Sequence, residues 1–319
     1  MIPPLKFVPI FKTMLWGGTR LPTFVGHAGP TENVGEAWVL SDVDGSLSVV
    51  ANGPFAGRTL RDVLRQHPQE IFGANPPSDG RFPLLLKFID AKQELSVQVH
   101  PNDEQAVADK GPGHRGKTEA WVILDANPTT SRIYAGFAKG QSEATFRKAM
   151  TTNTVPGTLH TFTPKPGDCV FLEAGTVHAI GADILLFEVQ QTSDITYRLF
   201  DWNRVDSKTG LPRQLHIDQG LACSGFDRGP CQPVTPMGSS LVDCPYFTLD
   251  RHDITSDKPL TLPDTQASRV LVGTSGNGVV NGVPLRMGEV LLLPACIGLA
   301  TVTTDDGFQL LECGLGSSA

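Results

Sequence analysis

Residues 167–181, GDCVFLEAGTVHAIG, open with a glycine and an acid, continue through an apolar run, and turn at Gly175 just before His178. The apolar run is short enough for a β-strand and too short for an isolated helix. Glycine on either side of such a run is typical of turns. The stretch therefore predicts a short strand followed by a tight turn that presents a histidine.

The same pattern of short apolar runs separated by turn residues extends over most of the 319 residues. The 33 glycines and 25 prolines recur between short runs rich in Val, Ile, Leu, Phe and Thr. Strands are predicted in the middle of the chain at 82–91, 95–100, 118–126, 168–174, 183–191 and 195–202. Because the connections are short, an antiparallel barrel fits better than alternating strand–helix units. Few helices are expected, and the clearest lie at 59–73, interrupted by His67-Pro68, and at 142–150.

A second β-rich block begins at about residue 236, with strands predicted at 246–254, 268–282, 288–295 and 308–314. The segment 225–240, rich in Gly, Pro and Ser, is the natural linker. Residues 288–302, GEVLLLPACIGLATV, begin like 167–181 but lack the second glycine and the histidine. We therefore predict a larger domain at 1–235 and a smaller C-terminal β domain at 236–319.

Charge and composition argue against some classes of binding partner. The net charge is −7 and no Lys/Arg block occurs, which argues against nucleic acid and anionic membranes. The N-terminal segment lacks a signal-peptide core and no run approaches 18 apolar residues, so a soluble cytoplasmic protein with a small-molecule partner is expected. Six cysteines without a CxxC pair suit reduced thiols, which leaves nitrogen and oxygen as metal ligands. The sequence makes no prediction of oligomeric state.

Polar side chains share strand faces at several places. In LSVQVHPND, residues 95–103, Gln98 and His100 lie on one face while Leu95, Val97 and Val99 lie on the other. In GKTEAWVIL, residues 116–124, Lys117 and Glu119 share a side. The alternative interpretation is the solvated face of an antiparallel strand. Together with His178, two imidazoles, a carboxylate and an amide form a plausible set for a divalent ion with one open position.

These segments carry a family resemblance. Residues 167–181 resemble the second conserved motif of cupin barrels, with Glu173 where proline is usual. In order, the segments 84–103, 116–124, 175–181 and 187–204, preceded by 11–21 and 34–42, resemble type I phosphomannose isomerases, which are zinc enzymes of the cupin superfamily. The resemblance implies a mainly β fold, with a catalytic, metal-binding jelly-roll barrel of the cupin type in residues 1–235 and a degenerate C-terminal barrel without a metal site in residues 236–319. The interval from Glu119 to His178 is too short for a helical insertion and implies the compact bacterial form.

The resemblance also assigns residues. It implies one Zn²⁺ per chain, with the metal ligands Gln98, His100, Glu119 and His178. It implies the catalytic residues Arg198, Lys117, Glu188 and Asp194, of which Arg198 and Lys117 also bind substrate. The chain departs from longer members at Gly116, where they have histidine, and at Thr118, where they have proline. Ring opening by that histidine is therefore not implied here.

The implied reaction interconverts mannose 6-phosphate and fructose 6-phosphate through an enediol. Glu188 is the candidate proton carrier, and its alternative role is a structural carboxylate paired with Arg198 or Lys117. The alternative role of Lys117 and Arg198 is to form surface salt bridges. The alternative role of Asp194 is to cap a turn or to orient Arg198.

Two other functions remain open. One is an isomerase of the same scaffold that acts on another sugar, with or without a phosphate group, and the other is a non-catalytic sugar-phosphate-binding regulator. Side chains outside the motifs are assigned no role. Trp16, Trp38 and Trp121 are expected in the core, and His114 and His160 at the surface.

Overall fold

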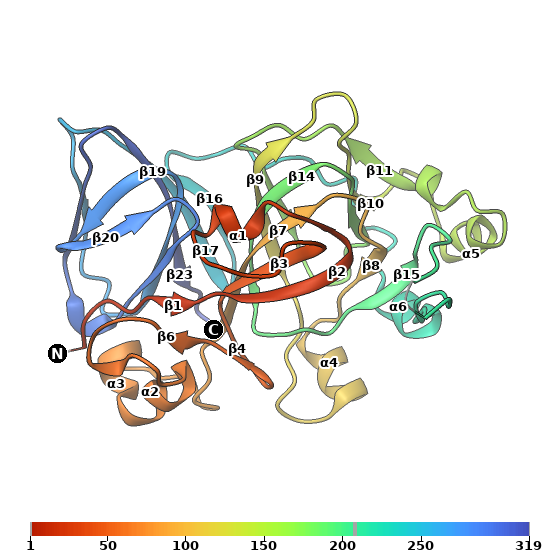
Figure 1. Ribbon diagram of the computed structural model, residues 1–319. Helices are drawn as coiled ribbons and strands as arrows, with labels where there is room; N and C mark the ends of the chain where they lie inside the picture. The colour runs from red at the N-terminus through yellow and green to blue at the C-terminus, as the bar shows by residue number, and fades with distance from the viewer. Residues whose placement is uncertain (1, 207–208, 319) are drawn as a thin grey trace.

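A computed structural model describes residues 2–206 and 209–318, and its strands form two facing sheets followed by a third (Figure 1). The larger facing sheet has the order β12-β9-β14-β7-β2-β3. Its strands are β2 (Ile10–Gly18), β3 (Val34–Leu40), β7 (Leu84–Ala91), β9 (Glu119–Ala126), β12 (Cys169–Leu172) and β14 (Ile184–Gln191). All the pairings within it are antiparallel.

The smaller facing sheet has the order β11-β10-β13-β8-β15. Its strands are β8 (Val97–Val99), β10 (Ile133–Phe137), β11 (Leu159–Phe162), β13 (His178–Ile180) and β15 (Tyr197–Phe200). An apolar cluster that includes Ile89 and Ile184 of the first sheet and Ile133 and Ile180 of the second lies between them. Two antiparallel sheets with a common core are the expected jelly-roll arrangement, so the predicted mainly β fold is confirmed.

Residues from Ser240 onward form the third sheet, ordered β16-β17-β23-β19-β22-β18, with β20 and β21 also paired to β19. Its strands are β16 (Ser240–Asp243), β17 (Phe247–Ile254), β18 (Leu260–Leu262), β19 (Arg269–Val280), β20 (Val283–Arg286), β21 (Val290–Leu293), β22 (Ala300–Thr303) and β23 (Phe308–Leu315). It has an apolar cluster of its own, around Leu271, Leu291 and Leu310. We propose on this basis that residues 1–235 and 236–319 are the two domains.

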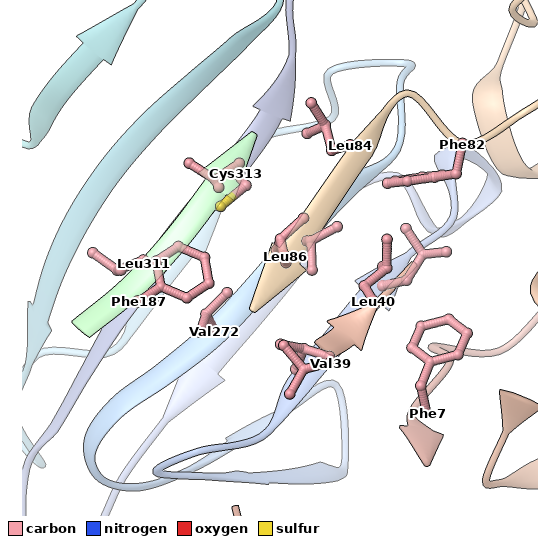
Figure 2. Packing of buried hydrophobic residues seen from close by; sticks show 14 of the residues in the cluster. Phe7, Val39, Leu40, Phe82, Leu84, Leu86, Phe187, Val272, Leu311 and Cys313 are labelled. Atoms are coloured by element: carbon pink, nitrogen blue, oxygen red, sulfur yellow. The ribbon is translucent and has the colours of Figure 1, made fainter. Parts of the chain in front are cut away.

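The third sheet also packs against the first. Figure 2 shows Val272, Leu311 and Cys313 beside Leu86 and Phe187, and all five belong to one buried cluster. The outer face of β7 and β14 is apolar because β19 and β23 cover it. The first sheet is therefore buried on both faces, which explains the nearly continuous apolar runs of its central strands.

Short helices and minor strand pairs complete the chain. The helices are α1 (Leu21–Phe24), α2 (Leu60–Gln66), α3 (Pro68–Phe72), α4 (Asp103–Lys110), α5 (Glu143–Thr151) and α6 (Ile217–Cys223). The 3₁₀ turns are η1 (Gly53–Phe55), η2 (Val155–Thr158) and η3 (Ala295–Ile297), and the minor strands are β1 (Phe7–Val8) with β6 (Val49–Val50) and β4 (Asp42–Val43) with β5 (Ser46–Leu47). No helix within the described ranges is long and apolar enough to cross a membrane.

The helix predicted at 59–73 is split in two, because Pro68 has no amide hydrogen to donate and begins a new helix. Thr59 accepts the amide hydrogen bond of Asp62, as its capping role requires. Ser142 caps α5 in the same way. The sequence analysis missed α4, although Asn102 and Gln105 form a capping box that marks its start.

Candidate metal centre and substrate pocket

Three of the predicted metal ligands come together between the two facing sheets. One ligand atom from each of His100, Glu119 and His178 lies within 4.8 Å of the others, and all three side chains are buried. Gln98 pairs with His178 across β8 and β13, and its Nε2 lies 3.3 Å from His178 Nε2. The strand pairing therefore brings all four predicted ligands to one place.

Backbone contacts at Nδ1 orient the imidazoles of His100 and His178 so that their Nε2 atoms face Glu119. The Nδ1 of His100 lies 2.8 Å from the Ile195 carbonyl oxygen, and the Nδ1 of His178 lies 2.9 Å from that of Thr176. The two Nε2 atoms then lie 3.5 Å and 3.2 Å from the Glu119 oxygens. A carbonyl partner on the second ring nitrogen is the usual support for a metal-binding histidine.

Glu119 shows most directly that the cluster suits a cation. Both of its carboxylate oxygens are buried without a hydrogen bond of good geometry, and its charged neighbour is Lys117, whose Nζ lies 2.8 Å from Oε2. Burial and the nearby Glu188 charge raise the pKa of Glu119 to about 7. Burial lowers the pKa of His178 to about 4, so its ring is neutral and able to bind a metal. Two imidazoles, a carboxylate and an amide fit a divalent metal ion.

Glu188, on β14, lies beside this cluster and is held between cations. Its Oε1 is 3.1 Å from Lys87 Nζ and 3.7 Å from Lys117 Nζ, and its Oε2 accepts a hydrogen bond of 2.9 Å from Trp121 Nε1. Burial alone would raise the pKa of Glu188, but the two lysine charges outweigh it and lower that pKa. Its nearest cation is Lys87, which the sequence analysis did not name, and it makes no ion pair with Arg198 among the described residues.

Arg198, on β15, lies opposite Gln98 in the strand register. Its Nη1 donates to the Gln214 carbonyl oxygen at 2.8 Å, whereas its Nε is buried without a hydrogen-bond partner. Asp194 is exposed, and within the described parts of the chain it forms no ion pair with Arg198. Orientation of Arg198 therefore comes from backbone groups and not from Asp194.

These groups line one cavity of about 460 Å³. Gln98, Lys117, Glu188, Asp194 and Arg198 are all among its lining residues. Trp16 and Trp38 are buried, as expected for core residues, but they also line the cavity. Trp121 lies fully in the core, as expected. His114 is exposed and His160 is partly exposed, outside the cavity.

The cavity also contains charged residues that sequence reasoning missed. Lys87 links two carboxylates, because its Nζ also lies 3.6 Å from Glu36 Oε2, which accepts a 2.6 Å hydrogen bond from Trp38. A lysine within the apolar run LLLKFIDA was the available signal for this role. Arg213 lines the cavity as well, and its Nε donates to Asp201 Oδ2 at 2.8 Å. Nothing in the sequence of its loop indicates that Arg213 lines the cavity.

The chain is similar to several proteins of one enzyme family. Residues 5–128 match the family model described as the phosphomannose isomerase type I catalytic domain. The chain is 35% identical over 311 residues to a probable mannose-6-phosphate isomerase, GmuF, of Bacillus subtilis strain 168, and the match covers 95% of this chain and 96% of that protein. The chain belongs to the type I phosphomannose isomerase family.

Two further relatives extend the match. The mannose-6-phosphate isomerase ManA of the same Bacillus strain is 36% identical over 311 residues, with 92% of this chain and 94% of ManA covered. A crystal structure of the mannose 6-phosphate isomerase from Bacillus subtilis superposes with a TM-score of 0.87 at 29% identity, covering 98% of this chain and all of that one. Family membership confirms the resemblance seen in the sequence, and with it an enzyme of the isomerase class.

Proposed function

We propose that this enzyme interconverts mannose 6-phosphate and fructose 6-phosphate through an enediol, with one Zn²⁺ per chain. The observation that carries the proposal is the buried Glu119 carboxylate, whose oxygens lie 3.5 Å and 3.2 Å from two imidazole nitrogens and 2.8 Å from the Nζ of Lys117, a residue that lines the cavity. Relatives named as mannose-6-phosphate isomerases support the choice of substrate.

Gln98, His100, Glu119 and His178 would hold the metal. When bound, Zn²⁺ would supply Lewis-acid stabilisation of the negative charge that develops on the substrate oxygens. Lys117 Nζ lies 3.0 Å from His100 Nε2 and 2.8 Å from Glu119 Oε2, so an ammonium group already stands at the metal-binding end of the cavity. We assign Lys117 to hold a substrate oxygen there through hydrogen bonds.

Isomerisation moves a proton from C2 of the aldose to C1 of the ketose, and it needs a base in its ionised form. Glu188 meets this requirement because Lys87 and Lys117 lower its pKa and Trp121 fixes one of its oxygens. Glu188 lines the cavity, where its ionised carboxylate can accept a carbon-bound proton of the substrate. We therefore assign the proton transfer to Glu188.

The phosphate group would bind beside Arg198 and Arg213, which line the same cavity. The unpartnered Nε of Arg198 can donate to a phosphate oxygen, and guanidinium groups suit phosphate recognition. Asp194 is exposed on the same lining, where its carboxylate can accept a sugar hydroxyl hydrogen bond. A cytoplasmic location is part of the proposal, and the six free cysteines suit that reducing compartment.

The test is turnover by zinc-loaded protein offered mannose 6-phosphate, free mannose and glucose 6-phosphate in parallel. The proposal expects fructose 6-phosphate from the first substrate, with a kcat/KM at least about a hundred-fold above that for free mannose, because several charge-assisted hydrogen bonds are lost without phosphate. Equal or faster turnover of free mannose would assign the enzyme to another sugar. Binding of mannose 6-phosphate without turnover would favour a regulator.

A further inference from the structure

Arg198 is held by a second segment of chain along the outer edge of β15. The amide of His216 donates to the Arg198 carbonyl oxygen at 2.7 Å. The Arg198 amide donates in return to His216 Nδ1 at 3.3 Å. Gln214 adds a third contact, since its carbonyl oxygen accepts from Arg198 Nη1. This bracket, residues 214–216, directly precedes α6, which lies beside β15 in Figure 1.

We propose that His216 is a positioning residue, whose side chain fixes the backbone of Arg198 so that its guanidinium meets the substrate phosphate. This inference rests on the proposed function, because it takes Arg198 as the phosphate ligand. The imidazole occupies the place of the carbonyl oxygen that a neighbouring strand would offer at a sheet edge. Without it the Arg198 amide would have no acceptor there, and the edge of β15 would be held by fewer bonds.

The guanidinium itself depends on this bracket. Within the described residues Arg198 has no carboxylate partner, so no ion pair fixes its direction. One nitrogen, Nη1, is held by the Gln214 carbonyl, and another, Nε, is buried and unpaired in the cavity wall. With one nitrogen engaged by the bracket, the unpaired Nε is left for a ligand. Loosening the bracket therefore releases both the strand and the side chain that binds phosphate.

The contact requires a neutral imidazole, because a protonated Nδ1 cannot accept a hydrogen bond. The charged groups that face His216 are Arg198 from β15 and Asp109 and Lys110 from α4. Burial lowers the pKa of His216 below its usual value, the two cations lower it further, and Asp109 opposes them. Asp109 is also engaged by Tyr197, whose hydroxyl donates to it at 2.5 Å. The acceptor form therefore dominates at neutral pH.

The test compares two variants of the zinc-loaded enzyme. His216→Asn keeps an acceptor atom at the δ position and does not titrate, whereas His216→Ala removes the acceptor. We expect His216→Ala to raise the KM for mannose 6-phosphate about five-fold or more, the equivalent of one lost hydrogen bond, with a smaller change in kcat. His216→Asn should keep the KM within about two-fold of wild type. Inhibition by inorganic phosphate should weaken in His216→Ala by the same factor.

A double-mutant cycle with Arg198→Ala distinguishes an effect of His216 that acts through Arg198 from a general loosening of the structure. If His216 acts through Arg198, adding His216→Ala to Arg198→Ala leaves the KM unchanged. The phosphate of the substrate also titrates below about pH 6. The pH dependence is therefore followed as the KM of the wild type divided by the KM of His216→Asn, and this ratio should rise as the pH falls. An unchanged KM in His216→Ala, or the same KM increase with and without Arg198, overturns the inference. Absence of wild-type turnover would instead overturn the proposed function.

Discussion

Lys87 Nζ lies 3.1 Å from Glu188 Oε1 and 3.6 Å from Glu36 Oε2, with all three side chains buried. One lysine thus joins two carboxylates within the wall of the cavity. Since Glu36 also accepts from Trp38 and Glu188 from Trp121, the pair is enclosed by indole donors. This arrangement keeps Glu188 ionised in a place where burial alone would favour the neutral acid.

Replacing Lys87 by methionine should therefore raise the pKa of Glu188. A base must be ionised to act, so the acid limb of the kcat/KM profile should move to higher pH by about one unit or more. Steady-state rates from pH 5 to 9 measure the shift. Lys12→Met is the matched control, because Lys12 also lines the cavity but bonds to Ser46, and its profile should keep the wild-type midpoint. An unmoved midpoint in Lys87→Met would remove Glu188 from the role of base.

Removing a metal ligand should abolish both metal binding and activity. His100→Ala and His178→Ala each delete one imidazole from a four-ligand set, and we expect zinc content to fall well below one per chain with at least a thousand-fold loss of kcat. Elemental analysis after dialysis, together with the isomerase assay, gives both values. His160→Ala is the control, since that histidine is outside the cavity and contacts Gln232. Either ligand variant with full zinc and wild-type kcat would contradict the assigned centre.

Arg198→Ala should weaken phosphate recognition specifically. Loss of charge-assisted hydrogen bonds to phosphate is worth about 1.5–3 kcal/mol each, which corresponds to a KM increase of about ten- to a hundred-fold. Inhibition by inorganic phosphate should weaken in parallel. Arg147→Ala provides the control, because its guanidinium pairs with Glu143 on the exposed side of α5. Wild-type inhibition by phosphate in Arg198→Ala would place the phosphate elsewhere.

Packing between the first and third sheets should be essential for stability. Leu311 is fully buried in the cluster shared by β7, β14, β19 and β23, and Leu311→Ala should cost about 2–5 kcal/mol of unfolding free energy in a denaturant titration. Leu299 is 58% exposed, and its alanine variant should stay within about 0.5 kcal/mol of wild type. Equal stabilities of the two variants would show that the third sheet contributes little to the catalytic barrel.

The sequence carried enough information to predict which residues share a strand face. Gln98 and His100 are two positions apart, so alternation alone put them together, and the structure agrees. That His178 faces Gln98 depends on which strands are neighbours, and pairing between distant strands leaves no local mark. The family resemblance supplied that step.

Residues outside the motif segments had weaker signals. Lys87 is a lone charge in a buried run, and its meaning emerges only when Glu36 and Glu188 are seen on the flanking strands β3 and β14. Arg213 and His216 lie in a loop segment whose conformation depends on tertiary contacts with Asp201 and Arg198. Periodicity cannot predict such contacts, because a loop has no repeating face.

The most direct test of the metal centre is a zinc titration of metal-stripped protein, followed by the rate of fructose 6-phosphate formation from mannose 6-phosphate. The account predicts no activity in the stripped protein, a linear rise with added zinc, and a plateau at one equivalent per chain. Glu119→Gln, which keeps the shape but not the charge, should give a far weaker response. Full activity in protein verified to be free of metal would contradict the account.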